Sequence, residues 1–177
     1  MFEVIILSEP SYVEISYDLD QATLLDLSPM VVATQILDNR GSEVDQEMTF
    51  EFSKEISHSN SFTHEHGFEV GVSVTAKAKI PFVAESEVEV SASTSHNWGY
   101  GEENSEATSF TTSSPVSVPG GKVYEGVATI KSTKMTIPYT GLVHFEGTAV
   151  TKEISGTYEG VDFYYLTTEI NDVSDEY

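Results

Sequence analysis

Apolar and polar side chains alternate along most of this chain, as they do in β-strands that bury one face. The segment "YVEISYDL" (12–19) alternates over its whole length. In "EMTFEFSKEI" (47–56) the alternation places Met48, Phe50 and Phe52 on one face of a strand. These segments predict long strands whose apolar faces form the core.

Other segments predict a buried strand, turns and one short helix. The run "MVVATQIL" (30–37) is typical of a strand buried on both faces. "DLDQATLLDLSP" (18–29) predicts one or two helical turns that end before Pro29. Turns are predicted at "DNRGS" (38–42) and "VSVPGG" (116–121). Further strands are expected at 122–137, 142–154 and 156–170.

The predicted elements make an all-β protein. At 177 residues the chain has the length of one domain with a substantial hydrophobic core, and no convincing internal repeat divides it. Long strands with few helices favour an elongated fold of twisted antiparallel strands. We therefore expect one module that covers residues 1–177.

The most informative alternation runs through residues 68–98 and is interrupted by "IPFVA" (80–84). If "IPFVA" is the tip of a hairpin, one register pairs opposite charges on one face and apolar groups on the other. The charged and polar pairs are then Lys79–Glu85, Lys77–Glu87, Thr75–Glu89 and Ser73–Ser91. The apolar pairs are Ala76–Val88, Val74–Val90 and Val72–Ala92.

This hairpin has two interpretations. Alternation alone is typical of a surface hairpin that rests one face on a core. Three details favour a membrane-crossing hairpin: an apolar face of small Val and Ala, a polar face of Ser, Thr and paired charges, and an apolar tip where a water-exposed turn would carry Asn, Asp or Gly. Each strand has the roughly 9 to 11 residues that cross a bilayer. Because a lone hairpin leaves backbone groups unpaired in lipid, several chains would have to close a barrel together.

The alternation assigns the residues of the hairpin to faces. The apolar tip comprises Ile80, Pro81, Phe82 and Val83. The face expected toward lipid comprises Val70, Val72, Val74, Ala76, Ala78, Val88, Val90 and Ala92. The face expected toward a water-filled lumen comprises Glu69, Ser73, Thr75, Lys77, Lys79, Glu85, Glu87, Glu89, Ser91 and Ser93. Since glutamates outnumber lysines on that face, we expect a pore that prefers cations.

Charge and composition exclude several functions. The chain has 29 acidic and 8 basic residues, a formal net charge of -21, which repels nucleic-acid phosphates and anionic lipid headgroups. It has no cysteine, so disulfides and thiolate chemistry are excluded. No apolar run reaches the roughly 18 residues of a transmembrane helix, and "MFEVIILSEP" (1–10) is too short and too acidic for a signal peptide. If the protein is secreted, its signal has been removed or it leaves by another route.

The hairpin and the residues around it resemble the pore-forming module of aerolysin-type toxins, including aerolysin-like and natterin-like proteins. The resemblance covers roughly residues 30–165 and depends on an ordered set of segments. These are "KIPFVAE" (79–85) between alternating strands, "WG" (98–99), a Ser/Thr-rich run, "VPGGKV" (118–123), "IPYTG" (137–141) and "SGTYEGVD" (155–162).

The resemblance implies a soluble, elongated β monomer that assembles into a heptamer- or octamer-like ring. Each protomer would release its hairpin, and the hairpins would join into a transmembrane β-barrel. The implied partners are further copies of this chain and a lipid membrane, with a glycan receptor or a partner subunit, since no separate receptor-binding domain is recognised. The monomer would be secreted or vesicular, and the ring would lie in the membrane of a target cell. No cofactor is implied.

Other chemistry has weaker support in the sequence. His64 and His66 share one strand face, but no second ligand pair accompanies them, so no metal site is expected. Together with His58 and His96 they flank the hairpin, and their protonation near about pH 5–6 would lower the local negative charge. We hypothesise that acidification promotes assembly. No nucleophile elbow or phosphate loop is present, so no enzymatic activity is expected. The alternative function is a non-lytic β-rich binding or regulatory module on the same scaffold.

Overall fold

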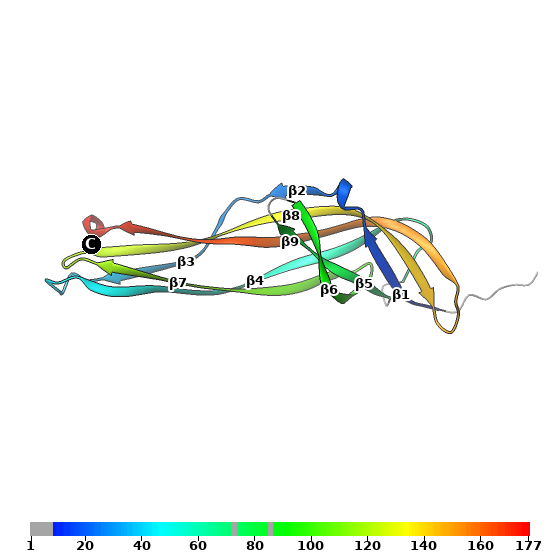
Figure 1. The fold of residues 1–177 in the computed structure, drawn as a ribbon, viewed down its shortest axis with the longest axis horizontal. Helices are drawn as coiled ribbons and strands as arrows, with labels where there is room; N and C mark the ends of the chain where they lie inside the picture. The colour runs from blue at the N-terminus through cyan, green and yellow to red at the C-terminus, as the bar shows by residue number, and fades with distance from the viewer. Residues whose placement is uncertain (1–8, 72–73, 85–86) are drawn as a thin grey trace, which may run out of the picture. The chain divides into compact units, whose positions relative to one another are not determined.

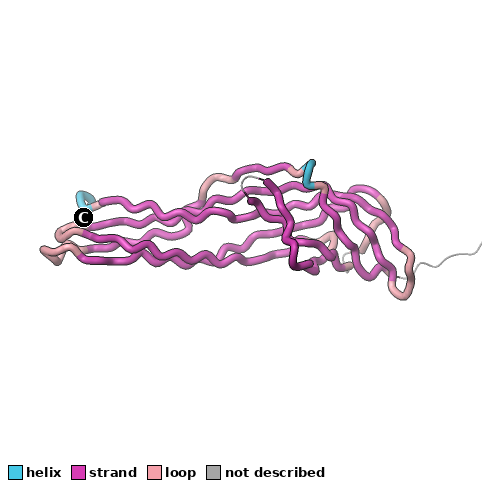
Figure 2. The backbone as a smooth tube through the Cα atoms, viewed as in Figure 1, coloured by secondary structure: helices cyan, strands magenta, loops and turns pink. Residues whose placement is uncertain are grey.

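The computed structural model describes residues 9–71, 74–84 and 87–177, with the backbone alone at 92–95. Strands dominate these residues, and the helical segments among them are two short 3-10 turns, η1 (Leu19–Gln21) and η2 (Ser174–Glu176) (Figure 2). No helix in this described part is long and apolar enough to cross a membrane. The predicted all-β class is confirmed.

Nine described strands form one mostly antiparallel sheet (Figure 1). The strands are β1 (Pro10–Tyr17), β2 (Thr23–Asp26), β3 (Met30–Asp38), β4 (Gln46–His66), β5 (Thr75–Ala84), β6 (Glu87–Gly99), β7 (Glu103–Val118), β8 (Val123–Phe145) and β9 (Thr151–Asp172). Hydrogen bonds join them in the order β6-β5-β1-β8-β9-β4-β7, while β2 and β3 also pair with β8. β1 pairs with β5 in parallel and with β8 in antiparallel orientation.

The predicted helix at 18–29 is wrong apart from η1, because the chain continues as strand β2. β2 pairs with β8, where the Thr23 hydroxyl donates to the carbonyl oxygen of Thr136 at 3.4 Å. Nucleation of a short helix is unfavourable because several residues must be ordered for the first hydrogen bond. Pairing with the long strand β8 provides backbone hydrogen bonds without this nucleation step.

Two strand predictions also need correction. The predicted strand at 142–154 is wrong, because β8 continues to Phe145 and the chain turns before β9, with Gly147 at a φ of 69°. β3 is not buried on both faces: Met30 and Val31 are 43% and 59% exposed. The predicted turns at 38–42 and 116–121 are confirmed, since β3 ends at Asp38 and β7 at Val118.

Contacts divide the chain into two compact units. Unit 1 comprises residues 1–25, 58–106 and 134–162, and unit 2 comprises residues 26–57, 107–133 and 163–177. The long strands β4, β7, β8 and β9 contribute residues to both units. Each unit has its own hydrophobic core.

The core of unit 1 is rich in aromatic side chains. The Phe62 ring lies 5.4 Å from that of Trp98, 5.2 Å from that of Tyr158 and 5.7 Å from that of Tyr139, measured between centroids. The hydroxyls of Tyr100 and Tyr139 are hydrogen-bonded at 2.6 Å. Burial raises the pKa of both phenols, so both stay neutral at physiological pH.

The core of unit 2 contains Phe50 and Phe52 of β4, which are 0% and 5% exposed, with Leu37, Val118 and Ala128. Met48 packs against them from the same face of β4. The face predicted from the alternation of β4 is therefore confirmed.

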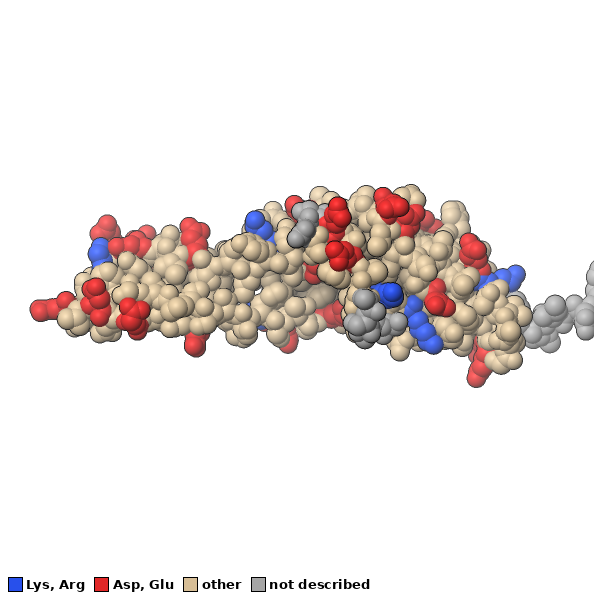
Figure 3. Space-filling model, in the orientation of Figure 1, with Lys and Arg blue, Asp and Glu red and all other residues tan. Residues whose placement is uncertain are grey.

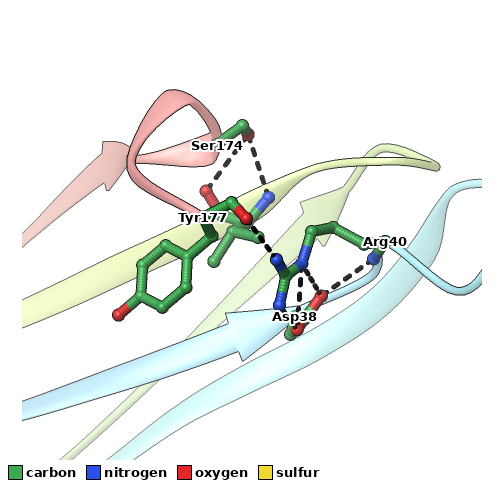
Figure 4. A network of polar contacts seen from close by, with 5 residues as sticks. Asp38, Arg40, Ser174 and Tyr177 are labelled. Carbon is green, nitrogen blue, oxygen red and sulfur yellow. Dashed lines mark hydrogen bonds and ion pairs between the residues drawn. The ribbon is translucent and has the colours of Figure 1, made fainter.

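The C-terminal residues contact the turn after β3 in unit 2 (Figure 4). Arg40 forms an ion pair with Asp38 at 2.6 Å, and its Nη1 donates to the carbonyl oxygen of Tyr177 at 2.8 Å. Hydrogen bonds from Arg40 lower the pKa of Asp38 to about 2. In the same segment, hydrogen bonds from Ser174 and then Lys122 lower the pKa of Asp172 to about 2.

Candidate functional site

The hairpin formed by β5 and β6 packs its apolar face into the core of unit 1. Val74, Ala76 and Ala78 are 3%, 0% and 2% exposed, and they share a cluster with Val13 and Ile15 of β1. Val70 and Val88 are half-buried against the same cluster, and Val90 is half-buried as well. The described residues of the set predicted to face lipid are thus buried or half-buried in this structure. Val72 and the side chain of Ala92 lie outside the described residues.

The polar face of the hairpin points to solvent. Lys77, Lys79, Glu87 and Glu89 are exposed, and so is Glu69 before the hairpin. The remaining described members of the predicted polar face, Thr75 and Ser91, are half-buried. The alternation therefore separates the two faces as predicted for the described part of the hairpin. Ser73, Glu85 and the side chain of Ser93 lie outside the described residues.

The predicted pairing of the two strands is wrong in this structure. Lys77 lies opposite Asn97 rather than Glu87, and Lys79 lies opposite Ser95 rather than Glu85. On the buried face Ala76 lies opposite Trp98, not Val88, and Ala78 lies opposite His96. The physical reason is packing, since the small Ala76 leaves room for the indole of Trp98, which is 5% exposed and stacks on Tyr158 at 5.9 Å.

The predicted turn at "IPFVA" is also wrong, because Ile80 to Ala84 belong to β5. Ala84 already pairs with Glu87 of β6, so β5 continues through the whole of the predicted turn. The register shifts between Lys79 and Pro81, and the buried face changes there: Pro81 is buried while Phe82 is 36% exposed. Proline has no N–H for the ladder, and such a residue is accommodated at a β-bulge.

Polar contacts from β1, from β9 and from Tyr100 after β6 hold β5 and the residue before it. The Tyr17 hydroxyl of β1 donates to the carbonyl oxygen of Lys79 at 3.1 Å. The backbone N–H of Val83 donates to Oδ2 of Asp162 in β9 at 2.8 Å. The N–H of Tyr100 donates to the carbonyl oxygen of Val74 at 2.8 Å. These contacts fix both ends of the strand that contains the predicted tip.

A second polar cluster surrounds the Glu106 carboxylate in unit 1. Asn60 Nδ2 donates to it at 3.1 Å and Trp98 Nε1 at 3.2 Å. His58 Nε2 and His96 Nδ1 each lie 3.7 Å from one of its oxygens. Two of the four predicted pH-sensing histidines therefore meet at one carboxylate, which links β4, β6 and β7.

The other two histidines lie apart from this carboxylate. His64 Nδ1 lies 3.5 Å from the Tyr100 hydroxyl, and His66 is exposed at the end of β4. Among the described residues, no group of three or more His, Asp or Glu side chains is arranged to hold a metal ion. The structure thus brings together His58 and His96 but not all four histidines.

Sequence reasoning missed Asp162, Glu106 and Tyr17. Asp162 gives the only sequence hint, because it interrupts the apolar run of "GVDFYY" (160–165) in a strand. Asp162 contacts Val83, 79 positions away, Tyr17 contacts Lys79, 62 positions away, and Glu106 contacts Asn60, 46 positions away, as well as the nearer Trp98. No local spacing encodes such contacts.

The family model described as Clostridium epsilon toxin ETX/Bacillus mosquitocidal toxin MTX2 matches residues 8–169. No curated protein sequence matches the chain significantly. The family match covers both strands of the hairpin and all the side chains that fix it.

Solved structures share the fold at low sequence identity. The lamprey immune protein has a TM-score of 0.66 and 23% identity, over 93% of this chain and 54% of that chain. The Mpp75Aa1.1 β-pore-forming protein from Brevibacillus laterosporus has a TM-score of 0.57 and 18% identity, over 94% of this chain and 70% of that one. The aerolysin-like protein of Bombina maxima has a TM-score of 0.60 and 13% identity, over 91% and 98% respectively. This chain spans about half the length of the lamprey protein.

Proposed function

Because this chain belongs to the family of Clostridium epsilon toxin and Bacillus mosquitocidal toxin MTX2, we propose that it forms pores in membranes. Monomers assemble into a ring on the membrane, and their β5–β6 hairpins join into a transmembrane β-barrel. The family match and the fold shared with a β-pore-forming protein support this function. The mechanism requires no catalytic group and no cofactor. The monomer is secreted or vesicular, and a receptor or partner subunit brings it to its target membrane.

The observation that carries the proposal is the two-faced hairpin. Val74, Ala76 and Ala78 are buried, whereas Lys77 and Lys79, which alternate with them, are exposed. Leaving the core for lipid exchanges one apolar environment for another, so the apolar face stays out of water in both states. The backbone groups of each hairpin are satisfied only when neighbouring hairpins close the barrel.

In the proposed barrel the two strands pair differently from this structure. Lys77 lies opposite Asn97 here and would lie opposite Glu87 in the barrel, a slip of ten positions along β6. Lys79 likewise exchanges Ser95 for Glu85. The buried Trp98 then leaves Ala76, and Ile80 to Val83 become the turn that enters the membrane first. Insertion therefore requires the hairpin to unpair before it pairs again, which opposes premature insertion.

Dye release from lipid vesicles tests this function with two matched substitutions on neighbouring residues of β6. Val88→Asp places a charge on the proposed lipid face, where it destabilises the barrel in every protomer, by less than the roughly 2–4 kcal/mol that an Arg or Lys costs at the bilayer midplane. We expect this variant to bind vesicles without releasing dye. Glu89→Gln changes the proposed lumen face, so it should still release dye while lowering the preference for cations.

The same experiment separates the alternative function. A non-lytic binding or regulatory module would bind vesicles or a partner without releasing dye in any variant. SDS-resistant rings recovered from the vesicles would support the pore. Equal dye release by the wild type and Val88→Asp would contradict the assignment of the hairpin faces.

A further inference from the structure

A pocket of about 450 Å³ lies between β1 and β5 in unit 1. Strand β5 contributes Lys77 and Lys79, and β1 contributes Tyr12, Glu14 and Ser16. The remaining lining residues are Ile15, Tyr17, Leu19 and Val90. The pocket therefore joins an apolar wall to a rim that carries two ammonium groups.

Lys77 and Lys79 place two positive charges on one strand of a strongly acidic chain. The chain has 8 basic residues and a formal net charge of -21, and acidic side chains outnumber basic ones over the face drawn in Figure 3. Among the described residues no carboxylate lies within ion-pairing distance of Lys77 or Lys79; the same holds for Lys54, Lys131 and Lys152, whereas Arg40, Lys122 and Lys134 have such partners. Two positive charges thus face one pocket without a carboxylate partner in the described part of the chain.

Neighbouring groups fix the position of both lysines. The Nζ atom of Lys77 lies 3.4 Å from the centroid of the Tyr12 ring, a cation–π contact that holds the ammonium at the rim. The Tyr17 hydroxyl donates to the backbone carbonyl of Lys79 at 3.1 Å. Burial raises the pKa of Tyr17, so this phenol remains a donor. The two ammonium groups are therefore presented by an ordered strand.

Among the described residues that line the pocket, Glu14 is the one carboxylate, and it lies close to His144. Its Oε2 lies 3.4 Å from Nε2 of His144, whose ring stacks on Tyr12 at 4.4 Å. Although Glu14 lies opposite Lys77 in the parallel register, its carboxylate lies beside the His144 ring and not within ion-pairing distance of either lysine. Glu14 therefore forms no ion pair with Lys77 or Lys79.

We propose that this pocket binds a phosphate group, with the ammonium groups of Lys77 and Lys79 and the Ser16 hydroxyl as donors. Two cations and a hydroxyl match the charge and the acceptor oxygens of a phosphate. Charge-assisted hydrogen bonds are stronger than hydrogen bonds between neutral groups. The apolar wall leaves room for a short organic substituent, so the ligand is a phosphate ester or inorganic phosphate. Binding is a property of the monomer and does not depend on pore formation.

One consequence depends on the proposed function. The barrel register pairs Lys77 and Lys79 with glutamates of β6, so the same ammonium groups cannot also bind phosphate between β1 and β5. An occupied pocket therefore favours the packed hairpin over the inserted one. Phosphate binding and its effect on pore formation are measured separately. Phosphate can therefore bind to the pocket even if it does not affect insertion of the hairpin.

Titration of the ¹⁵N-labelled full chain with sodium phosphate, against sodium chloride at equal ionic strength, tests the binding. We expect saturable shifts of the amide signals of β1 and β5 with phosphate alone. Lys77→Gln/Lys79→Gln should weaken binding at least about tenfold, since loss of even one hydrogen bond to a charged group corresponds to about a tenfold change in affinity. Lys54→Gln/Lys152→Gln removes the same charge from two exposed lysines outside the pocket and should bind as the wild type does.

Further arms identify the source of the phosphate. Lys77→Arg/Lys79→Arg keeps both charges and should retain binding, which separates a lost ligand contact from a disturbed strand. Phosphatidylcholine vesicles with and without phosphatidic acid test a lipid phosphate. Lysine-dependent binding of inorganic phosphate supports the proposal and indicates a free phosphate as the ligand. Lysine-dependent binding of phosphatidic acid vesicles alone supports it and indicates a lipid phosphate. No saturable binding in either arm, or equal binding by the Lys→Gln double variant, overturns it.

Discussion

The Asp162 carboxylate holds the end of β5 that contains the proposed tip. Its Oδ2 accepts the Val83 N–H at 2.8 Å, so Asp162→Ala leaves a half-buried N–H without this acceptor. A hydrogen bond to a charged group contributes about 1.5–3 kcal/mol. Because Val83 and Asp162 are partly exposed to water, we take the lower figure, about 1.5 kcal/mol. This corresponds to an approximately tenfold larger population of hairpins whose tip has detached.

Hydrogen exchange measures this population directly, because the Val83 amide exchanges when the tip opens. We expect about tenfold faster exchange at the end of β5 in Asp162→Ala. Asp162→Asn keeps a neutral acceptor and should show a smaller increase. If tip detachment limits pore formation, dye release from vesicles should accelerate in the same order.

Gln35→Ala is the matched control for this prediction. Gln35 Oε1 accepts the Glu51 N–H at 3.0 Å, so the variant removes the same kind of side chain to backbone contact within unit 2. It should leave exchange in β5 and dye release unchanged. Unchanged exchange of Val83 in Asp162→Ala, or equal acceleration by Gln35→Ala, would refute the role of this carboxylate.

Three further predictions concern charge, packing and pH. The carboxyl of Asp172 should titrate near pH 2, so its contribution to stability is complete above about pH 4 and is lost as the pH falls through about 2; a midpoint near about 4 by ¹³C NMR would contradict this. Gly156→Ala should destabilise the protein by about 2 kcal/mol or more, because its Cβ would overlap the backbone carbonyl oxygen of Thr63 in β4, whereas the Cβ of Gly41→Ala would meet open space; equal melting temperatures of the two variants would contradict this. Glu106→Gln should abolish any acceleration of dye release between about pH 7.5 and 5, since it removes the carboxylate beside two histidines; equal wild-type release at both pH values would refute the pH hypothesis itself.

The faces of the strands could be predicted from the sequence because the pleat fixes a period of two residues. Val74, Ala76 and Ala78 are buried and Lys77 and Lys79 are exposed, as the alternation predicts. The aerolysin-type relationship is also confirmed, by the family match and by the fold shared with the Bombina maxima protein. The faces of the strands follow from the local alternation, and the family relationship follows from the order of the segments along the chain.

The register of the hairpin could not be predicted in the same way. "IPFVA" is an apolar interruption with a proline, which is compatible with a turn or with a bulge inside a strand. The choice depends on the pairing of Trp98 with Ala76, and therefore on the aromatic core behind them. The contact of Asp162 with Val83 likewise joins residues 79 positions apart. Long-range packing decides these features, and a single sequence does not display it.

The central claim is that β5 separates from β1 before a pore forms, and a disulfide between these strands tests it most directly. Val13 and Ala76 are register partners in the parallel pair, and both are 0% exposed. In Val13→Cys/Ala76→Cys we expect no dye release from vesicles when the pair is oxidised and release at the wild-type level after reduction. Thr34→Cys/Val127→Cys, at register partners of β3 and β8 in unit 2, controls for cross-linking alone and should release dye in both states. Wild-type release by oxidised Val13→Cys/Ala76→Cys would contradict hairpin release.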